Sequence, residues 1–579
     1  MNTEHRHTEE TPLFISRSSL STEINKTGSW RFMRPKYDEK TAPCSVACPA
    51  GEDIARVEML AQKGLFKEAL ELLLMENPFP SICGRVCFHP CETACNRAEL
   101  DAPVAIRRLE RYLGDILVQD KMTPSVGKRP ANGKKICIVG AGPAGLAAGY
   151  FFAYLGYACD IFEARTEPGG LLRWGIPEYR LPVSVLNHEI RRIEDFGVKI
   201  ICEKPVDRHF FKTAKNRYDA IFIGCGHGRS MQMNIIGEHL AVAGLEFLDR
   251  LKRGEINAFD AEIAVIGGGN TAVDVARSLV RLGARAMIVY RRRKQDMPAF
   301  QSEVKMAVKE GVKIMELFAP VQITADGEGF VLTLQKMKTT GLVSDRSRAR
   351  VAPDGGSTQR LKVDKIFTAI GAEALEPWQL PSSPSVKTLE LDNCTIILDD
   401  VPYVIGGDLV NAEKSVADAI ASGKQAAIAM DILFKDGLRS ISSRLASCHV
   451  GDGPALSMES YMEGKRKGRN RSMVSYQEIN SDYFEPAPRV KASCLSKDQQ
   501  LTSFLEIEET FTHDQAKEEI ERCFNCGICN ACNNCWAFCP EVAVIVKDSL
   551  RQVNLDYCKG CGICIVECPR NAMALEKEI

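Results

Sequence analysis

The stretch Lys135-Ile-Cys-Ile-Val139-Gly140-Ala-Gly142-Pro-Ala144-Gly145 predicts a strand, a glycine turn and the first turn of a helix. In such a turn Gly140 makes the sharp bend, Gly142 lets a pyrophosphate approach the backbone, and Gly145 lets the helix pack on the strand. Amide hydrogens at the helix N-terminus, beside Ala144, would face the anion. The alternative is an ordinary glycine-rich turn. We predict a Rossmann-like dinucleotide-binding unit.

A carboxylate follows this turn at the distance that the dinucleotide fold requires. Glu163 comes eighteen residues after Gly145 and ends the next predicted strand, Cys159-Asp-Ile-Phe-Glu163. A carboxylate at this position accepts hydrogen bonds from ribose hydroxyls. The ligand should therefore carry a free 2'-hydroxyl, as FAD and NAD do.

A second unit of the same kind begins at the apolar stretch Glu262–Ile266. Its turn and first helical residues are Gly267, Gly269, Asn270, Thr271 and Ala272. The next strand ends in Arg291, Arg292 and Arg293 where an NAD-binding unit would have an acid. Guanidinium groups bind a 2'-phosphate, so Arg291 and Arg292 favour NADP(H). If the arginines are only a solvated surface run, NAD(H) stays open.

Eight cysteines near the C-terminus form two runs with the spacing C-x2-C-x2-C-x3-C-P. In two-cluster ferredoxins the first three thiolates of each run hold one [4Fe-4S] cluster, and the fourth crosses to the other cluster. One cluster would be held by Cys529, Cys532, Cys535 and Cys568. The other would be held by Cys558, Cys561, Cys564 and Cys539. The alternative is a pair of zinc knuckles, which favour other spacings and need no proline.

Length and composition narrow the class of protein. A chain of 579 residues is too long for one core and predicts several domains. Lys and Arg (74) balance Asp and Glu (75), which removes a general electrostatic argument for nucleic acid as a partner. Most of the 23 cysteines stand at metal-ligand spacings, which indicates a reducing compartment. No run of eighteen apolar residues or secretion signal occurs, so we expect no transmembrane segment and a cytoplasmic protein.

The pattern as a whole predicts a multidomain α+β and α/β protein. We expect a helical N-terminal iron-sulfur domain, two Rossmann-like domains for FAD and NAD(P)H, and a bacterial-type 2[4Fe-4S] ferredoxin domain. The expected parts are a flexible leader (1–40), the helical iron-sulfur domain (41–125), the FAD-binding domain (126–255 and 366–435), the NAD(P)H-binding domain (256–365), a surface linker (436–520) and the ferredoxin domain (521–579).

Two dinucleotide sites and iron-sulfur clusters on one chain predict a route for electrons. Nicotinamide delivers a hydride, whereas the clusters accept single electrons, and FAD converts one into the other. Hydride transfer needs positioning more than an acid-base pair, so we predict no catalytic side chain.

Four stretches of the sequence are distinctive: Cys83-GRV-Cys87-FHP-Cys91-ETA-Cys95, Gly169-GLLRWGIPEYRL-Pro182, Gly267-GGNTAVD and Gly406-Gly407-Asp408. In these stretches the chain resembles the glutamate synthase small subunit family, which shares its fold with the N-terminal half of dihydropyrimidine dehydrogenase and with NADPH:ferredoxin oxidoreductases. The resemblance covers roughly residues 40–435.

The resemblance implies further contacts to the flavin. It places Gly170, Leu171 and Arg180 along the flavin or its entry channel. It implies that Gly226 and Gly371 end strands that abut the flavin. Asp408, after Gly407, would bind the ribityl-phosphate portion.

The resemblance also implies two clusters in the N-terminal domain. One would be held by Cys48, Cys87, Cys91 and Cys95. The other uses a position that matches Cys44, a second that matches Glu110, and an upstream C-x2-C pair that this chain lacks. The pair Cys523 and Cys526 in the tail offers a replacement, so we hypothesise a cluster on Cys44, Glu110, Cys523 and Cys526. The alternative is that this cluster is absent and the pair are free thiols or spare ligands; the total is then three [4Fe-4S] clusters instead of four.

The fused ferredoxin tail makes the chain most similar to iron-sulfur flavoproteins that serve dissimilatory sulfite reductase or 2-oxoacid:ferredoxin oxidoreductases. The resemblance implies an NAD(P)H:acceptor oxidoreductase whose partner is a ferredoxin, a sulfite reductase or a 2-oxoacid oxidoreductase. Alternatives are the electron-input subunit of a glutamate synthase and a non-catalytic wiring subunit of a larger complex. The direction of electron flow, flavin-based bifurcation and a homodimer stay open.

Overall fold

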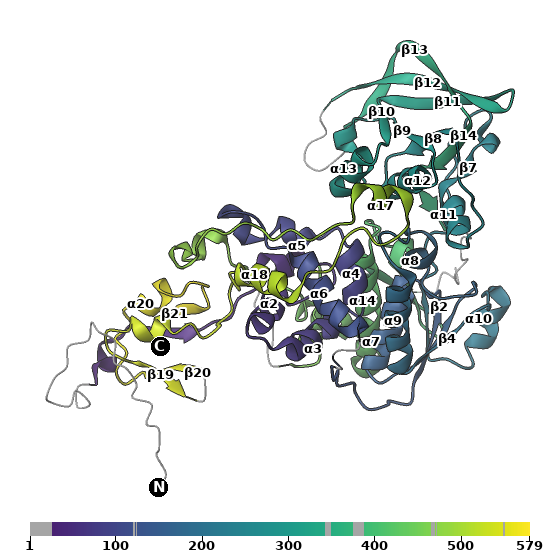
Figure 1. Cartoon of the computed structure of the whole chain (residues 1–579). Coiled ribbons are helices and arrows are strands. Elements are labelled where there is room, and N and C mark those ends of the chain that lie inside the picture. Colours follow the sequence, from purple (N-terminus) through teal and green to yellow (C-terminus); the bar gives the residue numbers. More distant parts are fainter. Residues whose placement is uncertain are drawn as a thin grey trace, which may run out of the picture.

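The computed structural model describes residues 26–119, 122, 124–341, 349–374, 387–464, 469, 472–547 and 550–578. Figure 1 shows three parts in a row: the second dinucleotide unit at upper right, the first dinucleotide unit with the helical N-terminal domain in the centre, and the ferredoxin module at lower left. No helix in these described ranges has the length and apolar character of a membrane span.

The first dinucleotide unit is built on a seven-stranded sheet in the order β16-β17-β18-β5-β2-β3-β4. Its strands are β2 (Lys135–Val139), β3 (Ala158–Phe162), β4 (Val198–Ile201), β5 (Ala220–Ile223), β16 (Lys387–Glu390), β17 (Cys394–Leu398) and β18 (Tyr403–Gly406). The helices around it are α7 (Pro143–Tyr154), α8 (Leu171–Trp174), α9 (Val183–Asp195), α10 (Arg208–Ala214) and α14 (Val416–Asp436). Residues 136–139 of β2 are all buried, as expected for a parallel strand covered on both faces.

Helices α7 and α14 pack closely because Gly423 of α14 has no side chain. A Cβ atom there would lie 2.6 Å from the backbone nitrogen of Ala148 in α7. This contact seats α14 directly on the helix that carries the first glycine turn.

The second unit has a five-stranded parallel sheet in the order β10-β9-β8-β14-β7. Its strands are β7 (Val242–Ala243), β8 (Glu262–Gly267), β9 (Arg285–Tyr290), β10 (Lys313–Glu316) and β14 (Lys365–Ala369). Three antiparallel strands lie at its far end: β11 (Phe318–Asp326), β12 (Gly329–Thr339) and β13 (Val351–Val363). Its helices are α11 (Gly244–Lys252), α12 (Asn270–Arg281) and α13 (Gln301–Lys309).

The boundaries of this unit differ from the predicted range 256–365. Strand β14 pairs with β8 and β7, so residues 242–252 and 365–369 belong to the second unit. The short strands β6 (Arg229–Ser230) and β15 (Ala372–Glu373) pair with each other and connect the two units. The predicted boundaries were wrong because each strand is short and finds its partner across a crossover.

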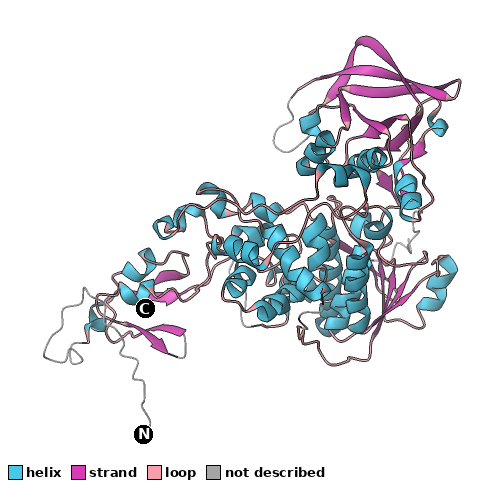
Figure 2. Ribbon diagram, in the orientation of Figure 1, coloured by secondary structure: helices cyan, strands magenta, loops and turns pink. Residues whose placement is uncertain are grey.

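The helical N-terminal domain shares one hydrophobic core with the first unit, whereas the second unit and the ferredoxin module have their own cores. Its helices are α1 (Pro43–Ala47), α2 (Ile54–Gln62), α3 (Phe66–Glu76), α4 (Pro80–Val86), α5 (Pro90–Thr93) and α6 (Ile106–Val118). The two domains therefore form one body, which Figure 2 shows as a helical mass beside the magenta sheet.

The predicted linker at 436–520 is more than a tether. It contains α15 (Ile441–Ala446), α16 (Met458–Tyr461), α17 (Lys497–Thr502) and most of α18 (His513–Glu521), and it runs along the body. Ile441, Met458, Val474 and Phe511 are buried. Because these buried apolar residues are isolated in a polar sequence, they form no periodic pattern, and no packed segment was predicted there.

The ferredoxin module contains α19 (Asn534–Ala537), β19 (Val544–Lys547), β20 (Leu550–Val553), α20 (Ile563–Val566) and β21 (Met573–Lys577). Strand β1 (Met33–Tyr37) pairs antiparallel with β21, from Met33 opposite Lys577 to Tyr37 opposite Met573. The prediction of a flexible leader over 1–40 was therefore wrong for residues 33–37. Residues 1–25 of that leader lie outside the described residues.

Candidate redox and nucleotide sites

The first glycine turn joins β2 to α7 and has the geometry of a phosphate-binding turn. Gly142 is the N-cap of α7, Pro143 is its first residue, and Ala144 follows. A Cβ atom on Gly145 would lie 1.9 Å from the carbonyl oxygen of Gly140, so only glycine allows this packing. The start of α7 therefore presents free backbone amides where a pyrophosphate can bind.

Glu163 lies directly behind this turn. Its buried carboxylate accepts hydrogen bonds from the backbone amides of Ala141, at 2.8 Å, and of Arg165, at 2.9 Å. These bonds fix its orientation at the end of β3, where a ribose would lie.

A second loop closes over the first turn. Gly170 has a φ of 52°, and a Cβ atom on it would lie 2.8 Å from Cα of Gly142. Leu171 next to it is 40% exposed, although it is a large apolar residue. The two glycines form a narrow backbone cradle that a side chain would fill, and this fits a flavin dinucleotide.

The other residues that the resemblance implied are spread around the same unit. Gly226 follows β5, and a Cβ there would meet open space; Gly371 follows β14; Gly407 and Asp408 lie in the turn between β18 and α14. A Cβ on Gly407 would lie 2.8 Å from Cβ of Ala144, so this turn faces the first glycine turn. Burial raises the pKa of Asp408.

The second glycine turn repeats the arrangement at α12. Gly267 ends β8, Gly269 is the N-cap, and Asn270, Thr271 and Ala272 form the first turn of the helix. No atom lies within 4 Å of a Cβ on Gly269, whereas one on Gly268 would lie 2.4 Å from the Tyr290 ring. The open side of the turn therefore lies at Gly269, before a twelve-residue helix.

The three arginines after β9 differ in their contacts. Arg293 forms a 2.7 Å ion pair with Asp296, and Arg292 donates to the carbonyl oxygen of Ala349 at 3.1 Å. Arg291 is exposed. Arg291 and the outer part of Arg292 are thus the groups that a 2'-phosphate could engage, whereas Arg293 already has its anion.

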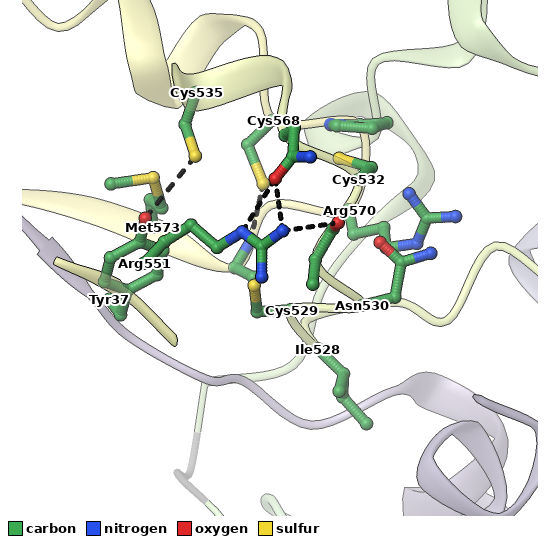
Figure 3. A pocket seen from close by; sticks show the side chains of 14 residues that line it. Tyr37, Ile528, Cys529, Asn530, Cys532, Cys535, Arg551, Cys568, Arg570 and Met573 are labelled. Atoms are coloured by element: carbon green, nitrogen blue, oxygen red, sulfur yellow. Dashed lines mark hydrogen bonds between the residues drawn. The ribbon is translucent and has the colours of Figure 1, made fainter. Parts of the chain in front are cut away.

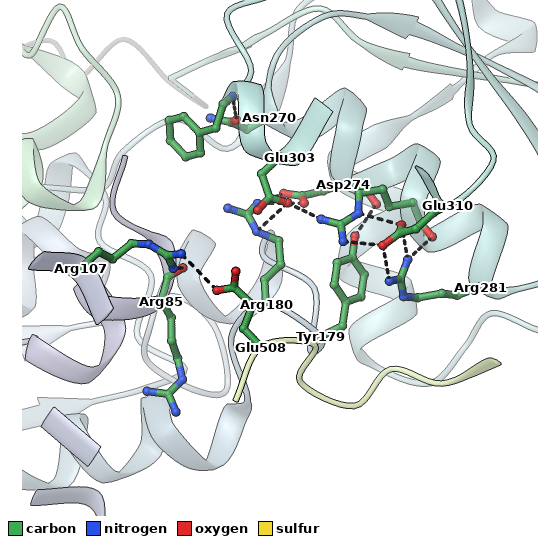
Figure 4. Close-up of polar contacts among 12 residues, drawn as sticks. Arg85, Arg107, Tyr179, Arg180, Asn270, Asp274, Arg281, Glu303, Glu310 and Glu508 are labelled. Carbon is green, nitrogen blue, oxygen red and sulfur yellow. Dashed lines mark hydrogen bonds and ion pairs between the residues drawn. The ribbon is translucent and has the colours of Figure 1, made fainter. Parts of the chain in front are cut away.

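A buried cluster of ion pairs joins the second unit to the first (Figure 4). Arg180 donates to both carboxylate oxygens of Asp274 on α12, at 2.8 and 2.7 Å. Next to this pair, Arg277 and Arg281 pair with Glu310 and lie over the ring of Tyr179. Arg180 was expected along the flavin channel; here it is held by the nicotinamide-type domain.

The tail locks the same region. The backbone amide of Ile507 donates to the carbonyl oxygen of Tyr179 at 3.1 Å. Glu508 accepts from Arg107 at 3.1 Å, and Glu506 accepts from Arg85 at 2.7 Å. The 504–510 segment therefore contacts both the 169–182 loop, which contains Tyr179, and the helical domain.

The eight ferredoxin cysteines line two cavities. Cys529, Cys532, Cys535 and Cys568 line one (Figure 3), and Cys539, Cys558, Cys561 and Cys564 line the other. These are the two groups that the spacing predicted. The backbone amides of Ala572 and Ala543 lie 3.4 and 3.3 Å from the sulfurs of Cys568 and Cys539. Such N–H groups stabilise thiolate ligands.

A third cavity of the same kind lies where the tail meets the helical domain. Its cysteines are Cys44, Cys95, Cys523 and Cys526. Each of the three cavities is lined by four cysteines, so all three offer the same donor set to a multi-atom group.

This third set differs from the hypothesised one, in which Glu110 stood in the place of Cys95. Glu110 lies one helical turn beyond Ile106, and only Ile106 borders the cavity. Its carboxylate instead accepts from Asn77 Nδ2 at 2.8 Å, on the side of Cys48 and Cys87. The direction of α6 thus separates Glu110 from Cys44.

The same geometry regroups the other N-terminal set. Burial raises the pKa of Cys48, and the nearby Glu52, Cys87 and Glu110 raise it further. Cys91 lies close to Cys48 and Cys87. Cys48, Cys87, Cys91 and Glu110 therefore lie near one another, as does the buried Cys83, whereas Cys95 borders the third cavity.

Burial raises the pKa of the Cys526 thiol to about 12, and that of Cys44 and Cys523 well above the ordinary range. A buried thiolate needs a cationic partner, and a coordinated metal supplies one by displacing the proton. The donor set thus fits a metal cluster.

Several contacting residues had no signal in the sequence. Tyr37 Oη lies 3.4 Å from Cys535 Sγ, and Arg551 and Arg570 line the same ferredoxin cavity. Phe88, between two predicted ligands, stacks on Phe300 of the second unit with ring centroids 6.1 Å apart. Only the neighbouring cysteines could have drawn attention to Phe88.

Three family models match the chain. Residues 134–399 match the pyridine nucleotide-disulphide oxidoreductase family, and residues 37–122 match dihydropyrimidine dehydrogenase domain II with its 4Fe-4S cluster. Residues 551–574 match a 4Fe-4S binding domain. These matches fall on the parts described above.

Curated relatives cover most of the chain. The NADP(+)-dependent formate dehydrogenase subunit beta of Moorella thermoacetica is 33% identical over 84% of this chain and 70% of its own length. The NADPH-Fe(3+) oxidoreductase subunit beta of Geobacter sulfurreducens is 36% identical over 58% of this chain. The chain spans about half (52%) of that relative's length. The NAD-dependent dihydropyrimidine dehydrogenase subunit PreT of Escherichia coli is 33% identical over 67% of this chain and 90% of its own.

Among solved structures, FprA from Mycobacterium tuberculosis (His57Gln mutant) aligns with a TM-score of 0.44 and 16% identity, over 58% of this chain and 89% of that one. Thioredoxin reductase from Lactococcus lactis aligns with a TM-score of 0.38 and 18% identity, over 51% and 96%.

Proposed function

Because the chain belongs to the family of NAD(P)H-dependent iron-sulfur flavoprotein oxidoreductases, we propose that it passes electrons between NADP(H) and a separate redox protein. Its cofactors are FAD, a nicotinamide nucleotide and [4Fe-4S] clusters. When bound, FAD exchanges a hydride with nicotinamide and exchanges single electrons with the clusters.

The order of the three parts carries this proposal. The nicotinamide-type domain and the ferredoxin module lie at opposite ends of the molecule, and the body with the FAD cradle lies between them (Figure 1). The FAD cradle thus lies between the nicotinamide nucleotide site, which exchanges a hydride, and the cluster sites, which exchange single electrons. The body also contains cysteines between the cradle and the ferredoxin module.

The proposed cradle for FAD consists of the first glycine turn, Glu163 and the facing loops. Gly140, Gly142, Ala144 and Gly145 would hold the pyrophosphate, and Glu163 would hold the adenosine ribose. Gly170, Leu171 and Gly226 would border the ring system, and Gly407 and Asp408 would meet the ribityl-phosphate part. Leu171 would exclude water from the ring because it is apolar and open on one side.

The proposed nicotinamide nucleotide site consists of Gly267, Gly269, Asn270, Thr271 and Ala272, with Arg291 and Arg292 at the 2'-phosphate. The open space at Gly269 supports the pyrophosphate position. Arg180 and Gly371 lie at the boundary between the units. We propose that Arg180 acts as a positioning residue through Asp274.

The proposed cluster ligands of the ferredoxin module are the two cavity sets described above. In the helical domain we propose Cys48, Cys87, Cys91 and Glu110 for a further cluster. This makes three clusters, before the third cavity is considered.

The partner is proposed to be a protein with its own redox centre: a ferredoxin, a sulfite reductase or a 2-oxoacid oxidoreductase. Two relatives are named as beta subunits, which supports a role within a larger redox complex. A homodimer is compatible with either. The proposed compartment is the cytoplasm, since most of the 23 cysteines stand at metal-ligand spacings, as expected in a reducing compartment.

Anaerobic addition of NADPH, or separately of NADH, to the purified protein tests the proposal. The expected result is rapid bleaching of both flavin and cluster absorbance, faster with NADPH. If neither nucleotide bleaches a protein that contains FAD, the proposal is wrong, and the chain is instead a non-catalytic electron-transfer subunit that another protein reduces.

A further inference from the structure

We propose that Cys44, Cys95, Cys523 and Cys526 together hold a [4Fe-4S] cluster that joins both ends of the chain and links the body electrically to the ferredoxin module. The inference rests on the proposed function and deepens it, because it assigns a fourth cluster and gives the route by which electrons leave the body.

The cavity is built from three separate segments. Cys44 lies in α1, Cys95 directly precedes the 3-10 turn Asn96–Glu99, and the other two cysteines follow α18. Cys44 and Cys526 are each 8% exposed. The two cysteines of the tail therefore meet cysteines of the N-terminal domain from far along the chain, as the 430 positions between Asn96 and Cys526 illustrate.

The lining provides hydrogen bonds for thiolate ligands. Asn96 Nδ2 lies 3.5 Å from Cys526 Sγ, and the backbone amide of Asn525 lies 3.4 Å from Cys523 Sγ. Arg97, which is only 2% exposed, also borders the cavity, and its guanidinium is held in place by an ion pair with Asp101.

The tail is fixed in register with the helical domain at this point. Arg97 donates to the carbonyl oxygen of Arg522 at 3.1 Å, and Arg522 pairs with Asp101 at 2.9 Å. The backbone amide of Ala105 donates to Glu519 at 2.7 Å. These bonds hold the C-x2-C pair opposite Cys95 without help from the metal, as a preorganised site requires.

The position of the cavity makes it a relay. Cys526 borders this cavity and Cys529 borders the first ferredoxin cavity, so the two are joined by three residues, at most about 11 Å of chain. On the other side, Cys44 and Cys48 are four residues apart, as are Cys95 and Cys91, at most about 14 Å of chain. The four cysteine groups thus form one continuous series.

Electron transfer along this series balances one electron at a time. Each electron oxidises the group that it leaves and reduces the group that it enters. NAD(P)H gives up two electrons and one proton as it becomes NAD(P)+, so two electrons pass for each nucleotide, and the proton goes to solvent. No other reductant is needed.

The first test is the iron content of the full-length protein, purified anaerobically, per bound FAD. Four clusters predict about sixteen irons, and a protein with only three would contain about twelve. Twelve irons in a protein with intact ferredoxin clusters would overturn the proposal. The count does not depend on nicotinamide, so the failure of this proposal is distinct from failure of the proposed function.

Two variants assign the iron to these residues. The double variant Cys523→Ser/Cys526→Ser should lose about four irons while the electron paramagnetic resonance signals of both ferredoxin clusters remain. Cys95→Ser, which leaves the tail unchanged, should lose the same signal. The matched control is Cys494→Ser, an exposed tail cysteine outside every cavity described, which should keep all the iron. Retention of about sixteen irons by both cavity variants would contradict the assignment.

Electron transfer gives an independent readout. In the double variant NADPH should still bleach FAD at the wild-type rate, whereas rapid reduction of the ferredoxin clusters should be lost. Equal rates of ferredoxin reduction in variant and wild type would show that electrons take another route.

Discussion

We propose that Arg291 and Arg292 determine the preference of the enzyme for NADP(H) over NAD(H). Replacing both with alanine should raise KM for NADPH about tenfold or more, because each charge-assisted hydrogen bond contributes about 1.5–3 kcal/mol. KM for NADH should change little. Steady-state kinetics with both nucleotides measures the difference.

The matched control is Arg285→Ala, since Arg285 is also exposed but begins β9 instead of following it. An equal loss with NADPH and NADH in the double variant would contradict a 2'-phosphate contact.

Glu189 on α9 predicts a dependence of stability on pH. Burial raises its pKa to about 7, although Arg192 and the amide of Ser81, 2.9 Å away, oppose the shift. Because the folded pKa lies above the unfolded value of 4.5, the folded state keeps the proton more tightly. Its stabilising contribution is complete below about pH 4.5 and is lost as the pH rises through about 7.

Glu189→Gln should therefore gain apparent Tm relative to wild type as the pH rises from about 5 to about 8, by an amount that reflects up to about 3 kcal/mol. Asp195→Asn, an exposed change on the same helix, is the control. Parallel Tm curves for wild type and Glu189→Gln would rule out this titration.

The N-terminal ligands show how far single residues could be predicted. The spacing of Cys529 to Cys568 was enough to group the ferredoxin cysteines, because local turns determine it. Grouping Cys44 with Cys95 or with Glu110 depends on the direction of α6 relative to the tail. That direction comes from packing between distant segments and has no local pattern.

Among the elements, the contact of α12 with Arg180 of the 169–182 loop holds the nicotinamide-type domain in place. Arg180→Leu or Asp274→Asn should retain FAD but slow reduction of FAD by NADPH, since either leaves a buried charge or dipole without its partner. Breaking a buried pair costs about 3–5 kcal/mol. Stopped-flow bleaching at saturating NADPH measures the hydride step, and KM should change less than kcat.

The two variants distinguish two roles for Arg180: alignment of the nicotinamide-type domain and direct contact with the flavin. Asp274 belongs to the other unit, so an equal defect in both variants supports alignment, and Arg180→Lys should restore part of the rate. A defect confined to the Arg180 variant would mean that this residue acts on the flavin itself.

Strand β1 predicts that the N-terminus is needed for the ferredoxin module. Removal of residues 1–38 exposes the edge of β21 and deletes Tyr37, which lies beside Cys535. The truncated protein should keep FAD but lose about eight irons. Removal of residues 1–25, before the described region, is the matched control and should keep all the iron.

This element could not be predicted from the sequence. Its five residues, Met33–Tyr37, include Pro35 and show no clear alternation, and the partner strand is distant in the sequence, with 542 positions between the paired residues Arg34 and Glu576. By contrast, strands β2 and β8 were predictable because each precedes a glycine turn that itself marks the strand end.

At the scale of the whole molecule, the continuous core ties the helical domain to the FAD cradle, whereas the two outer parts have cores of their own. We therefore propose that the outer domains bind a nucleotide and a redox protein without rearrangement of the shared core. The order of the domains was predictable from the motifs, but the way in which the tail returns to Tyr179 and Cys95 was not, since it depends on scattered single contacts.

Electron entry through FAD is tested by a stopped-flow measurement in which NADPH is mixed anaerobically with wild-type protein and with protein freed of FAD. In the wild type, flavin absorbance should fall before cluster absorbance. Clusters in the FAD-free protein should stay oxidised with NADPH yet be reduced by dithionite. Reduction of the clusters by NADPH without FAD would contradict the conversion of hydride to single electrons at the flavin.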